Sequence, residues 1–219
     1  TQMACDLARD CERLGVDGLM VMPAMVYSAK PAETVAHFRS VAGASALPIM
    51  VYNNPPIYKT DVTPEMLAEL ADCETVVCIK ESSGDINRVH LLARNYPHIQ
   101  LSCGMDDQAL EFFAWGARSW ICAGSNFLPE EHVLLYKTCV LDGDFSKGRR
   151  IMSAMLPLMR VLEQGGKFIQ CVKHGVETTG LVSGPVRPPL KGLNKEEKRE
   201  LEQVIRTLKT TIKAIQGGN

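Results

Sequence analysis

Short apolar runs alternate with segments of helical spacing along most of the chain, and this alternation restricts the possible folds more than any other feature. Five runs have the length and composition of buried strands: residues 19–22, 47–52, 75–80, 99–103 and 119–123. The segments before and between them repeat apolar residues at three- and four-residue steps, which predicts helices. Strands and helices in alternation form a parallel sheet covered on both faces. We therefore predict an α/β fold.

Residues that favour helix starts support this assignment. Pro31 begins one predicted helix, Thr63 and Pro64 begin a second, and Asp85 begins a third. After Pro129 the pattern is wholly helical, and the last helix opens with Asn194 followed by Glu197, a spacing typical of a capping box. We expect residues 1–142 to form the α/β part and residues 143–219 to form a C-terminal helical region.

Two architectures fit such a pattern, an open doubly wound sheet and a TIM barrel. A barrel needs eight strands and begins on a strand, whereas this chain shows five strands and begins on a helix. The periodicity alone favours the open sheet.

Composition excludes several classes of protein. The chain has 24 Lys and Arg against 25 Asp and Glu, with no basic stripe, which argues against nucleic acid or a membrane surface as partners. No apolar run approaches the length of a membrane span, and the first residues do not resemble a signal peptide. Eight cysteines occur without a CxxC pair, so we expect reduced thiols, a cytoplasmic location and no metal site.

Lys80 ends the apolar run of residues 75–80, an unusual place for a residue that is seldom buried. Its ammonium could extend to solvent at the edge of the sheet, or pair with Glu81 or Asp85. Alternatively, apolar surroundings would favour the neutral amine, which can attack a ketone and form a Schiff base. The protonated imine would then act as an electron sink for bond cleavage or formation.

Tyr52 ends the preceding strand run, 28 residues before Lys80, which is one strand–helix–strand step. Its ring could simply lie at the edge of the sheet with its hydroxyl in water. In a parallel sheet, however, the two strands would be neighbours, so Tyr52 could serve imine formation as a general acid and base. The small residues at Gly104 and 123–126 either make turns or let backbone N–H groups approach an anion.

These motifs resemble those of the dihydrodipicolinate synthase / N-acetylneuraminate lyase family. The resemblance begins with YNNPP at 52–56 and IKESSGD at 79–85, continues through SCGMDD at 102–107 and ICAGSN at 121–126, and extends into the helical tail. It implies a TIM (β/α)8 barrel in which the five strands seen here are strands four to eight, followed by the helical tail. It also implies a Schiff-base lyase and an assembly of two or four identical subunits.

The resemblance assigns roles to individual residues. Lys80 would form a covalent imine with a 2-oxo acid, without any other cofactor, and Tyr52 would relay protons. Backbone near Gly104 and Ile121 would line the substrate pocket, and Tyr27 would stand in for a tyrosine that family members offer across a subunit interface. The family's Gly-Thr-Thr-Gly-Glu loop after strand two has no counterpart in this sequence. We expect the first three strands to be supplied from outside the given residues, re-formed by a partner chain, or lost.

One departure from the family pattern reduces the number of candidate substrates. Synthases of the family place an arginine five residues after the tyrosine to hold a substrate carboxylate, and here that position is Ile57. Two segments, NNPPIYKTDVTPE at 53–65 and KFIQCVKHG at 167–175, most resemble those of members that deaminate and dehydrate a pyrroline-4-hydroxy-2-carboxylate. The alternatives are a pyruvate-dependent synthase or aldolase, and a catalytically silent truncated homologue.

Overall fold

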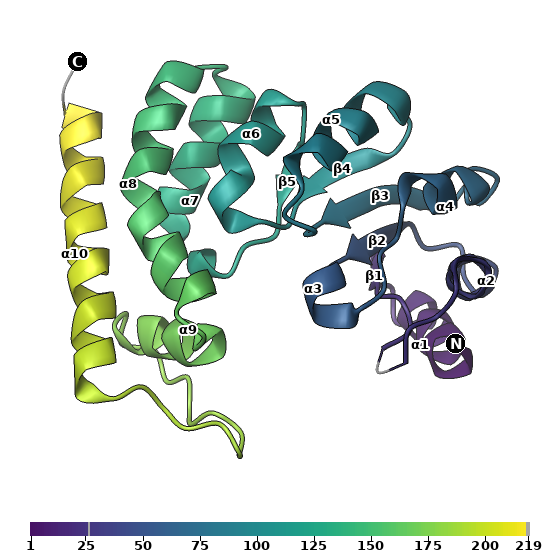
Figure 1. Cartoon of the computed structure of the whole chain (residues 1–219), viewed down its shortest axis with the longest axis horizontal. Coiled ribbons are helices and arrows are strands. Elements are labelled where there is room, and N and C mark those ends of the chain that lie inside the picture. The colour runs from purple at the N-terminus through teal and green to yellow at the C-terminus, as the bar shows by residue number, and fades with distance from the viewer. Residues whose placement is uncertain (26, 218–219) are drawn as a thin grey trace. The chain divides into compact units, whose positions relative to one another are not determined.

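Five parallel strands form one sheet in the computed structural model, which describes residues 1–25 and 27–217. The strands are β1 (Leu19–Val21), β2 (Ile49–Asn53), β3 (Val76–Glu81), β4 (Gln100–Cys103) and β5 (Ser119–Trp120). They lie in chain order, so each strand pairs with the next one along the sequence (Figure 1). A doubly wound sheet reverses its strand order at a switch point, and no reversal occurs here. The open-sheet interpretation is therefore wrong, and the consecutive order is that of a barrel wall.

The register of the sheet arranges side chains in rows that cross the strands. Val51, Ile79 and Leu101 form one row of buried apolar side chains. The next row is Tyr52, Lys80, Ser102 and Ser119, and the row after that is Asn53, Glu81, Cys103 and Trp120. Successive residues of a strand point to opposite faces, so Lys80 faces away from Ile79 and Glu81. The pairing of β2 with β3 shifts register between Ile49 and Met50.

The chain divides into two compact units, and the sheet belongs to unit 1, which comprises residues 1–105 and 115–121. Its helices are α1 (Gln2–Arg13), α2 (Pro31–Ala42), α3 (Pro55–Tyr58), α4 (Pro64–Glu69) and α5 (Ile86–Asn95). The predicted caps are confirmed for α4 and α5, where the side chains of Thr63 and Asp85 accept backbone N–H bonds. The short helix α3 was not predicted. Asn54 caps it and Pro55 occupies its first position.

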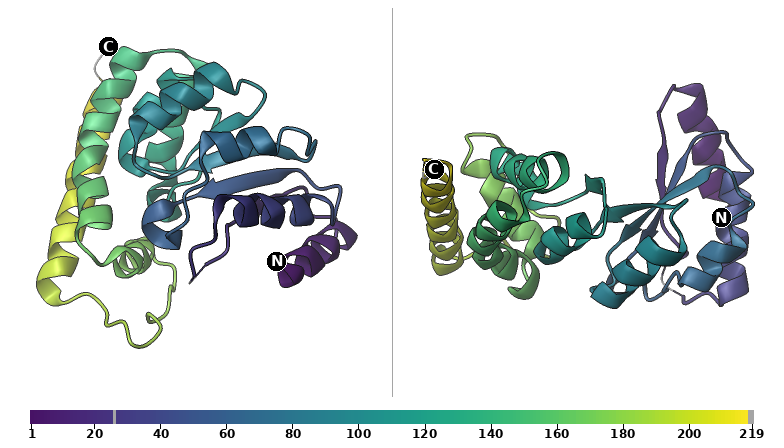
Figure 2. Two further views of the ribbon diagram at one scale, coloured as in Figure 1. Left: turned by 45° about the vertical axis from the view of Figure 1, so that its right-hand side comes forward. Right: turned by 90° about the horizontal axis from the view of Figure 1, so that it is seen from above.

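Unit 2 comprises residues 106–114 and 122–219, and its described residues, up to 217, form helices and connecting segments but no strand. Its elements are η1 (Asp106–Gln108), α6 (Ala109–Ala114), η2 (Gly124–Asn126), α7 (Pro129–Tyr136), the π-helix η3 (Lys137–Leu141), α8 (Phe145–Gln164), α9 (Phe168–Glu177) and α10 (Lys195–Gly217). Helix α10 lies along α8 in every view of Figures 1 and 2. Its apolar stripe is buried, and the predicted capping box at Asn194 and Glu197 is confirmed.

The fifth strand is shorter than predicted, because β5 ends at Trp120 rather than at residue 123. The N–H group of Ala123 donates to the Asp106 carboxylate at 3.2 Å, so it is not available to a strand ladder. The domain boundary expected at residue 142 stays a prediction. Within the described residues, we find no helix with the length and apolar character needed to cross a membrane.

Candidate active site

Lys80 and Tyr52 are brought together at the carboxyl ends of β3 and β2. They are register partners, and the Lys80 ammonium lies 3.9 Å from the centroid of the Tyr52 ring. Lys80 is only 7% exposed, and no ion pair involves it in the part of the chain that the structure describes. The prediction that Lys80 and Tyr52 lie side by side on neighbouring strands is therefore confirmed. The alternative in which Lys80 pairs with Glu81 or Asp85 has no support: Glu81 faces the other side of the sheet, and the Asp85 side chain accepts from Asn87 instead.

The pKa of the Tyr52 hydroxyl is shifted by its neighbours. Partial burial raises the pKa of Tyr52, but the hydrogen bond from Asn54, the positive charge of Lys80 and hydrogen bonds with Lys80 and Ser82 lower it, so the net pKa lies below the ordinary tyrosine value. The Asn54 side-chain N–H donates to the Tyr52 hydroxyl at 3.1 Å. A tyrosine with a lowered pKa exchanges protons more readily near neutral pH.

Tyr58 and Asn54 are site residues that the sequence reasoning missed. The Tyr58 ring meets the Tyr52 ring edge to face, with centroids 5.4 Å apart. Both residues come from the turn that includes α3, so the capped turn after β2 supplies the surroundings of the tyrosine. The signal that could have revealed them is the pair of asparagines directly after a strand, since Asn favours helix caps.

Gly104 follows β4 and lies against Lys80 and Ser82. Its N–H donates to the Glu81 carbonyl at 3.0 Å. A Cβ atom at this position would clash with the Ser82 hydroxyl and would lie 3.0 Å from the Lys80 Cγ atom. Only glycine fits such a close approach, so Gly104 is needed to make room beside Lys80.

Two buried hydroxyls lie next to Lys80. Ser102 is its register partner on β4, and Ser82 follows it by two residues; both are at most 1% exposed. Within the described residues the Ser102 hydroxyl has no hydrogen-bond partner, whereas the Ser82 hydroxyl interacts with Tyr52 and lowers the pKa of that tyrosine. An unpaired buried hydroxyl is unfavourable, so the Ser102 hydroxyl could pair with a polar atom of a bound molecule.

Ile121 and Tyr27 occupy more open positions. The Ile121 N–H donates to the Cys103 carbonyl at 3.1 Å, and its side chain is 41% exposed. Tyr27 follows β1 and is 86% exposed, so within the described residues it forms no part of the cluster around Lys80. The binding roles of both residues stay predictions.

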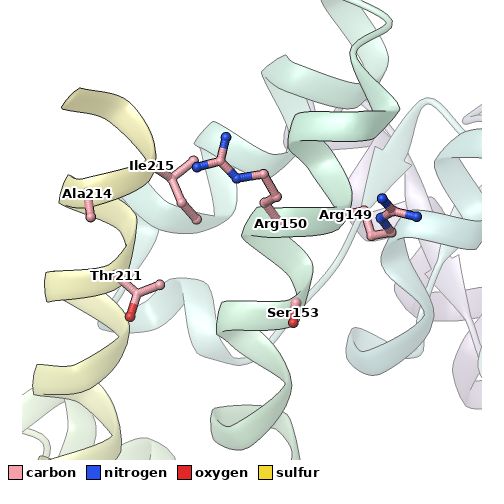
Figure 3. A pocket seen from close by; sticks show the side chains of 6 residues that line it. All are labelled: Arg149, Arg150, Ser153, Thr211, Ala214 and Ile215. Atoms are coloured by element: carbon pink, nitrogen blue, oxygen red, sulfur yellow. The ribbon is translucent and has the colours of Figure 1, made fainter. Parts of the chain in front are cut away.

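Other features of the described residues fall outside this cluster. No group of three or more His, Cys, Asp or Glu residues could hold a metal ion. No disulfide joins any of the eight cysteines. A groove in unit 2 is lined by residues of α8 and α10 only: Arg149, Arg150, Ser153, Thr211, Ala214 and Ile215 (Figure 3). In this view the Arg150 side chain points toward Ile215 and the Arg149 side chain points away from it.

Comparisons with known proteins agree with this geometry. The model of the dihydrodipicolinate synthetase family matches residues 1–208. A 4-hydroxy-tetrahydrodipicolinate synthase of Exiguobacterium sibiricum is 32% identical over 213 residues, which cover 97% of this chain and 72% of that protein. A protein of Azotobacter vinelandii named "Probable 5-dehydro-4-deoxyglucarate dehydratase" is 30% identical, with 95% of this chain and 70% of that protein covered.

A solved structure shows the same architecture. The 4-hydroxy-tetrahydrodipicolinate synthase of Methylacidiphilum fumariolicum superposes with a TM-score of 0.90 at 25% identity. The superposition covers 97% of this chain and 71% of that one. The five strands in consecutive order thus correspond to part of a TIM barrel, as the resemblance implied.

Proposed function

Because the chain belongs to the dihydrodipicolinate synthetase family, whose members are lyases that use a lysine Schiff base, we propose that Lys80 forms an imine with a 2-oxo acid or a cyclic imine acid. The observation that carries this proposal is the contact between the buried Lys80 and the partly buried Tyr52 on neighbouring strand ends. A nucleophilic amine needs an adjacent acid and base, and Tyr52 is close enough to be that group.

The chemistry follows from the surroundings of the two side chains. The neutral Lys80 amine attacks the substrate carbon that carries the carbonyl or ring imine, and Tyr52 transfers the protons that this addition and the following elimination require. The resulting iminium is a cation, and the Tyr52 ring face beside the Lys80 nitrogen stabilises positive charge there. The iminium then withdraws electrons from the neighbouring carbon, where a bond breaks or forms.

For the substrate, we favour a pyrroline-4-hydroxy-2-carboxylate. Deamination and dehydration of this cyclic acid consume one water overall and release ammonia and a 2-oxo acid semialdehyde. Ile57 is apolar and 67% exposed, so it offers no charge to a second carboxylate. The unpaired buried hydroxyl of Ser102 suits a substrate that bears a hydroxyl group. The dehydratase name of the Azotobacter relative supports an elimination reaction within the family.

A pyruvate-dependent synthase or aldolase is the second candidate, supported by the names of the synthases above. Ile57 separates the two candidates. Rapid condensation of pyruvate with an aldehyde that carries a carboxylate would contradict our use of Ile57. In that assay the Ile57→Arg variant should gain rate over the unchanged protein, because it restores a bidentate partner for the carboxylate.

The experiment that tests the Schiff base is trapping with pyruvate and borohydride. Reduction should attach the keto acid to Lys80, as read by peptide mass mapping. Lys80→Arg should abolish the adduct, whereas the exposed control Lys30→Arg should keep it. Trapping by Lys80→Arg at the original rate would refute the proposal. A protein that folds but shows neither adduct nor turnover would instead be the catalytically silent homologue.

The chain is also proposed to work as a dimer or tetramer in the cytoplasm with a small-molecule 2-oxo acid substrate. The exposed position of Tyr27 is consistent with a contribution to a neighbouring subunit. Sedimentation velocity on the unchanged protein and on Tyr27→Ala tests this proposal. A single monomeric species in the unchanged protein would contradict it.

A further inference from the structure

Directly behind the catalytic pair lies a second pair of buried polar side chains. Asn53 follows Tyr52 and Glu81 follows Lys80, and the two are register partners that are 0% and 1% exposed. Because side chains alternate along a strand, they lie on the face of the sheet opposite Lys80. They therefore touch neither the Lys80 ammonium nor a substrate bound to it.

Hydrogen bonds join these two side chains to each other and to both strand ends. The Asn53 side-chain N–H donates to the Glu81 carboxylate at 2.9 Å, and the Ser83 N–H donates to the other carboxylate oxygen at 2.5 Å. The Asn53 side-chain oxygen accepts from the Val62 N–H at 2.8 Å. The two residues thus tie the turns after β2 and β3 to one another.

A charged pair extends this network outward. Arg88 of α5 donates to both oxygens of Asp61, at 2.6 and 2.8 Å. The Asp61 oxygen that receives the shorter bond also accepts from the Asn53 side chain at 3.1 Å. The segment after β2 is therefore fastened to the helix that follows β3, on the same face as Glu81.

Stability alone does not explain a carboxylate in this position. Burial raises the pKa of Glu81, although hydrogen bonds from Ser83 and Asn53 partly oppose this. Apolar side chains of similar size often replace such buried polar groups without loss of stability, and buried polar groups can instead specify a unique arrangement. Here the arrangement that needs specifying is the register, because the pairing of β2 with β3 already shifts between Ile49 and Met50. The early part of the ladder does not dictate how the strand ends align.

We propose that Asn53 and Glu81 are positioning residues that lock the register of β2 and β3 and so hold Tyr52 beside Lys80. A slip by one residue would send Tyr52 or Lys80 to the opposite face of the sheet. Even a displacement of about 1 Å slows a positioned reaction by as much as ~100-fold. The proposal rests on the roles proposed above for Lys80 and Tyr52.

Two variants separate positioning from stability. We call the hydrogen-bonded pair of Asn53 and Glu81 the register lock. Asn53→Ala removes it, and the double variant Asn53→Leu with Glu81→Leu replaces both polar partners with apolar side chains. The double variant also leaves the Val62 and Ser83 N–H groups without their side-chain acceptors, so it should unfold at a lower denaturant concentration, and its trapping rate is compared without denaturant, where circular dichroism shows the protein to be folded. Both should trap pyruvate with borohydride about 10- to 100-fold more slowly than the unchanged protein. The control Thr34→Val removes a buried hydroxyl in α2, and it should trap pyruvate at the original rate.

Ultraviolet titration of Tyr52 gives a readout that does not depend on catalysis. The Tyr52 signal is the difference between each protein and the same protein carrying Tyr52→Phe. Loss of the lock should move the Tyr52 ring away from the Lys80 charge and shift its titration upward, toward the ordinary value of about 10. A mere loss of stability would not produce this shift in the folded protein.

The outcomes separate the two proposals. If the unchanged protein forms no adduct, the Schiff-base proposal fails, while the Tyr52 titration still tests the lock. If the folded variants keep both the trapping rate and the Tyr52 titration, the lock is refuted. Should both variants fail to fold, Asp61→Asn decides, because Asp61 is 39% exposed and its loss weakens only the outer contact. A smaller shift in the same direction supports the lock, and no shift refutes it.

Discussion

The ammonium of Lys80 lies 3.9 Å from the centre of the Tyr52 ring, across the boundary between two strands that are separated by a helical crossover in the sequence. This contact couples the two groups electrostatically. The charge on Lys80 lowers the pKa of Tyr52, and the ring face stabilises a cation at the Lys80 nitrogen. In the proposed mechanism the iminium carries a positive charge at the same nitrogen, so the same ring face would stabilise it.

Tyr52→Phe should slow imine formation by about 100- to 10,000-fold, the range typical of removing a general acid or base. The ring that faces Lys80 is retained in this variant, so the fold and the cation–π contact should survive. Rapid quenching with borohydride measures the rate. The control Tyr96→Phe alters a tyrosine outside the site, and an equal loss in that variant would point to a general effect on folding.

Gly104→Ala should slow the reaction of Lys80 strongly while the sheet as a whole stays folded. The added methyl group clashes with the Ser82 hydroxyl and crowds the Lys80 stem, and overpacking of this kind costs about 1–3 kcal/mol of unfolding free energy. We expect lower stability in urea and a much slower borohydride trapping reaction. Gly192→Ala is the matched control, because its added methyl group would meet open space. A Gly104→Ala protein with normal trapping would show that Ser82 and Lys80 can move aside.

Glu163 on α8 should make unit 2 less stable as the pH rises. Burial, and then the negative charges of Asp107 and Asp106, raise the pKa of Glu163 to about 7, above the value of about 4.5 in the unfolded chain. A carboxyl group whose pKa is raised by folding is tolerated best when it is protonated. The folded protein therefore keeps its full stability below pH 4.5 and loses stability as the pH rises through 7, where Glu163 has to ionise in its buried position. One pKa unit corresponds to about 1.4 kcal/mol, and solvent screening at this partly exposed side chain reduces the full value, so the loss is on the order of 1–2 kcal/mol.

The variant Glu163→Gln tests this prediction. It should match the unchanged protein near pH 4, exceed its stability at pH 8, and remove most of the slope between those values. Urea unfolding followed by circular dichroism at several pH values provides the measurement. The exposed control Glu196→Gln should leave the slope unchanged, and an unchanged slope in Glu163→Gln would contradict the prediction.

The cysteines should differ strongly in reactivity. Burial raises the pKa of Cys78 and of Cys139 to about 11, so little thiolate is present at pH 8 and access is poor. We expect Cys11, which is only partly buried, to react with iodoacetamide first. Peptide mass mapping over time would order the thiols. Early modification of Cys78 or Cys139 in the folded protein would contradict the assigned burial.

The sequence by itself determined the alternation of strands and helices, most helix starts and the two strand-end residues Lys80 and Tyr52. These features depend on local physics, namely the periodicity of burial, the chemistry of caps and the rule that parallel strands end at one edge of a sheet. They needed no knowledge of which strands pair.

The tertiary structure alone decided the strand order, the length of β5 and the partners of the site residues. Periodicity favoured the wrong architecture because both candidate folds use the same strand–helix units and differ only in how the strands are arranged. The sequence also could not predict two hydrogen bonds, from Asn54 to Tyr52 and from Asn53 to Glu81. The pairing of β2 with β3 shifts register within the ladder, and local sequence does not show that shift. A side chain's neighbours across a sheet are set by such long-range pairing, and local sequence carries little information about it.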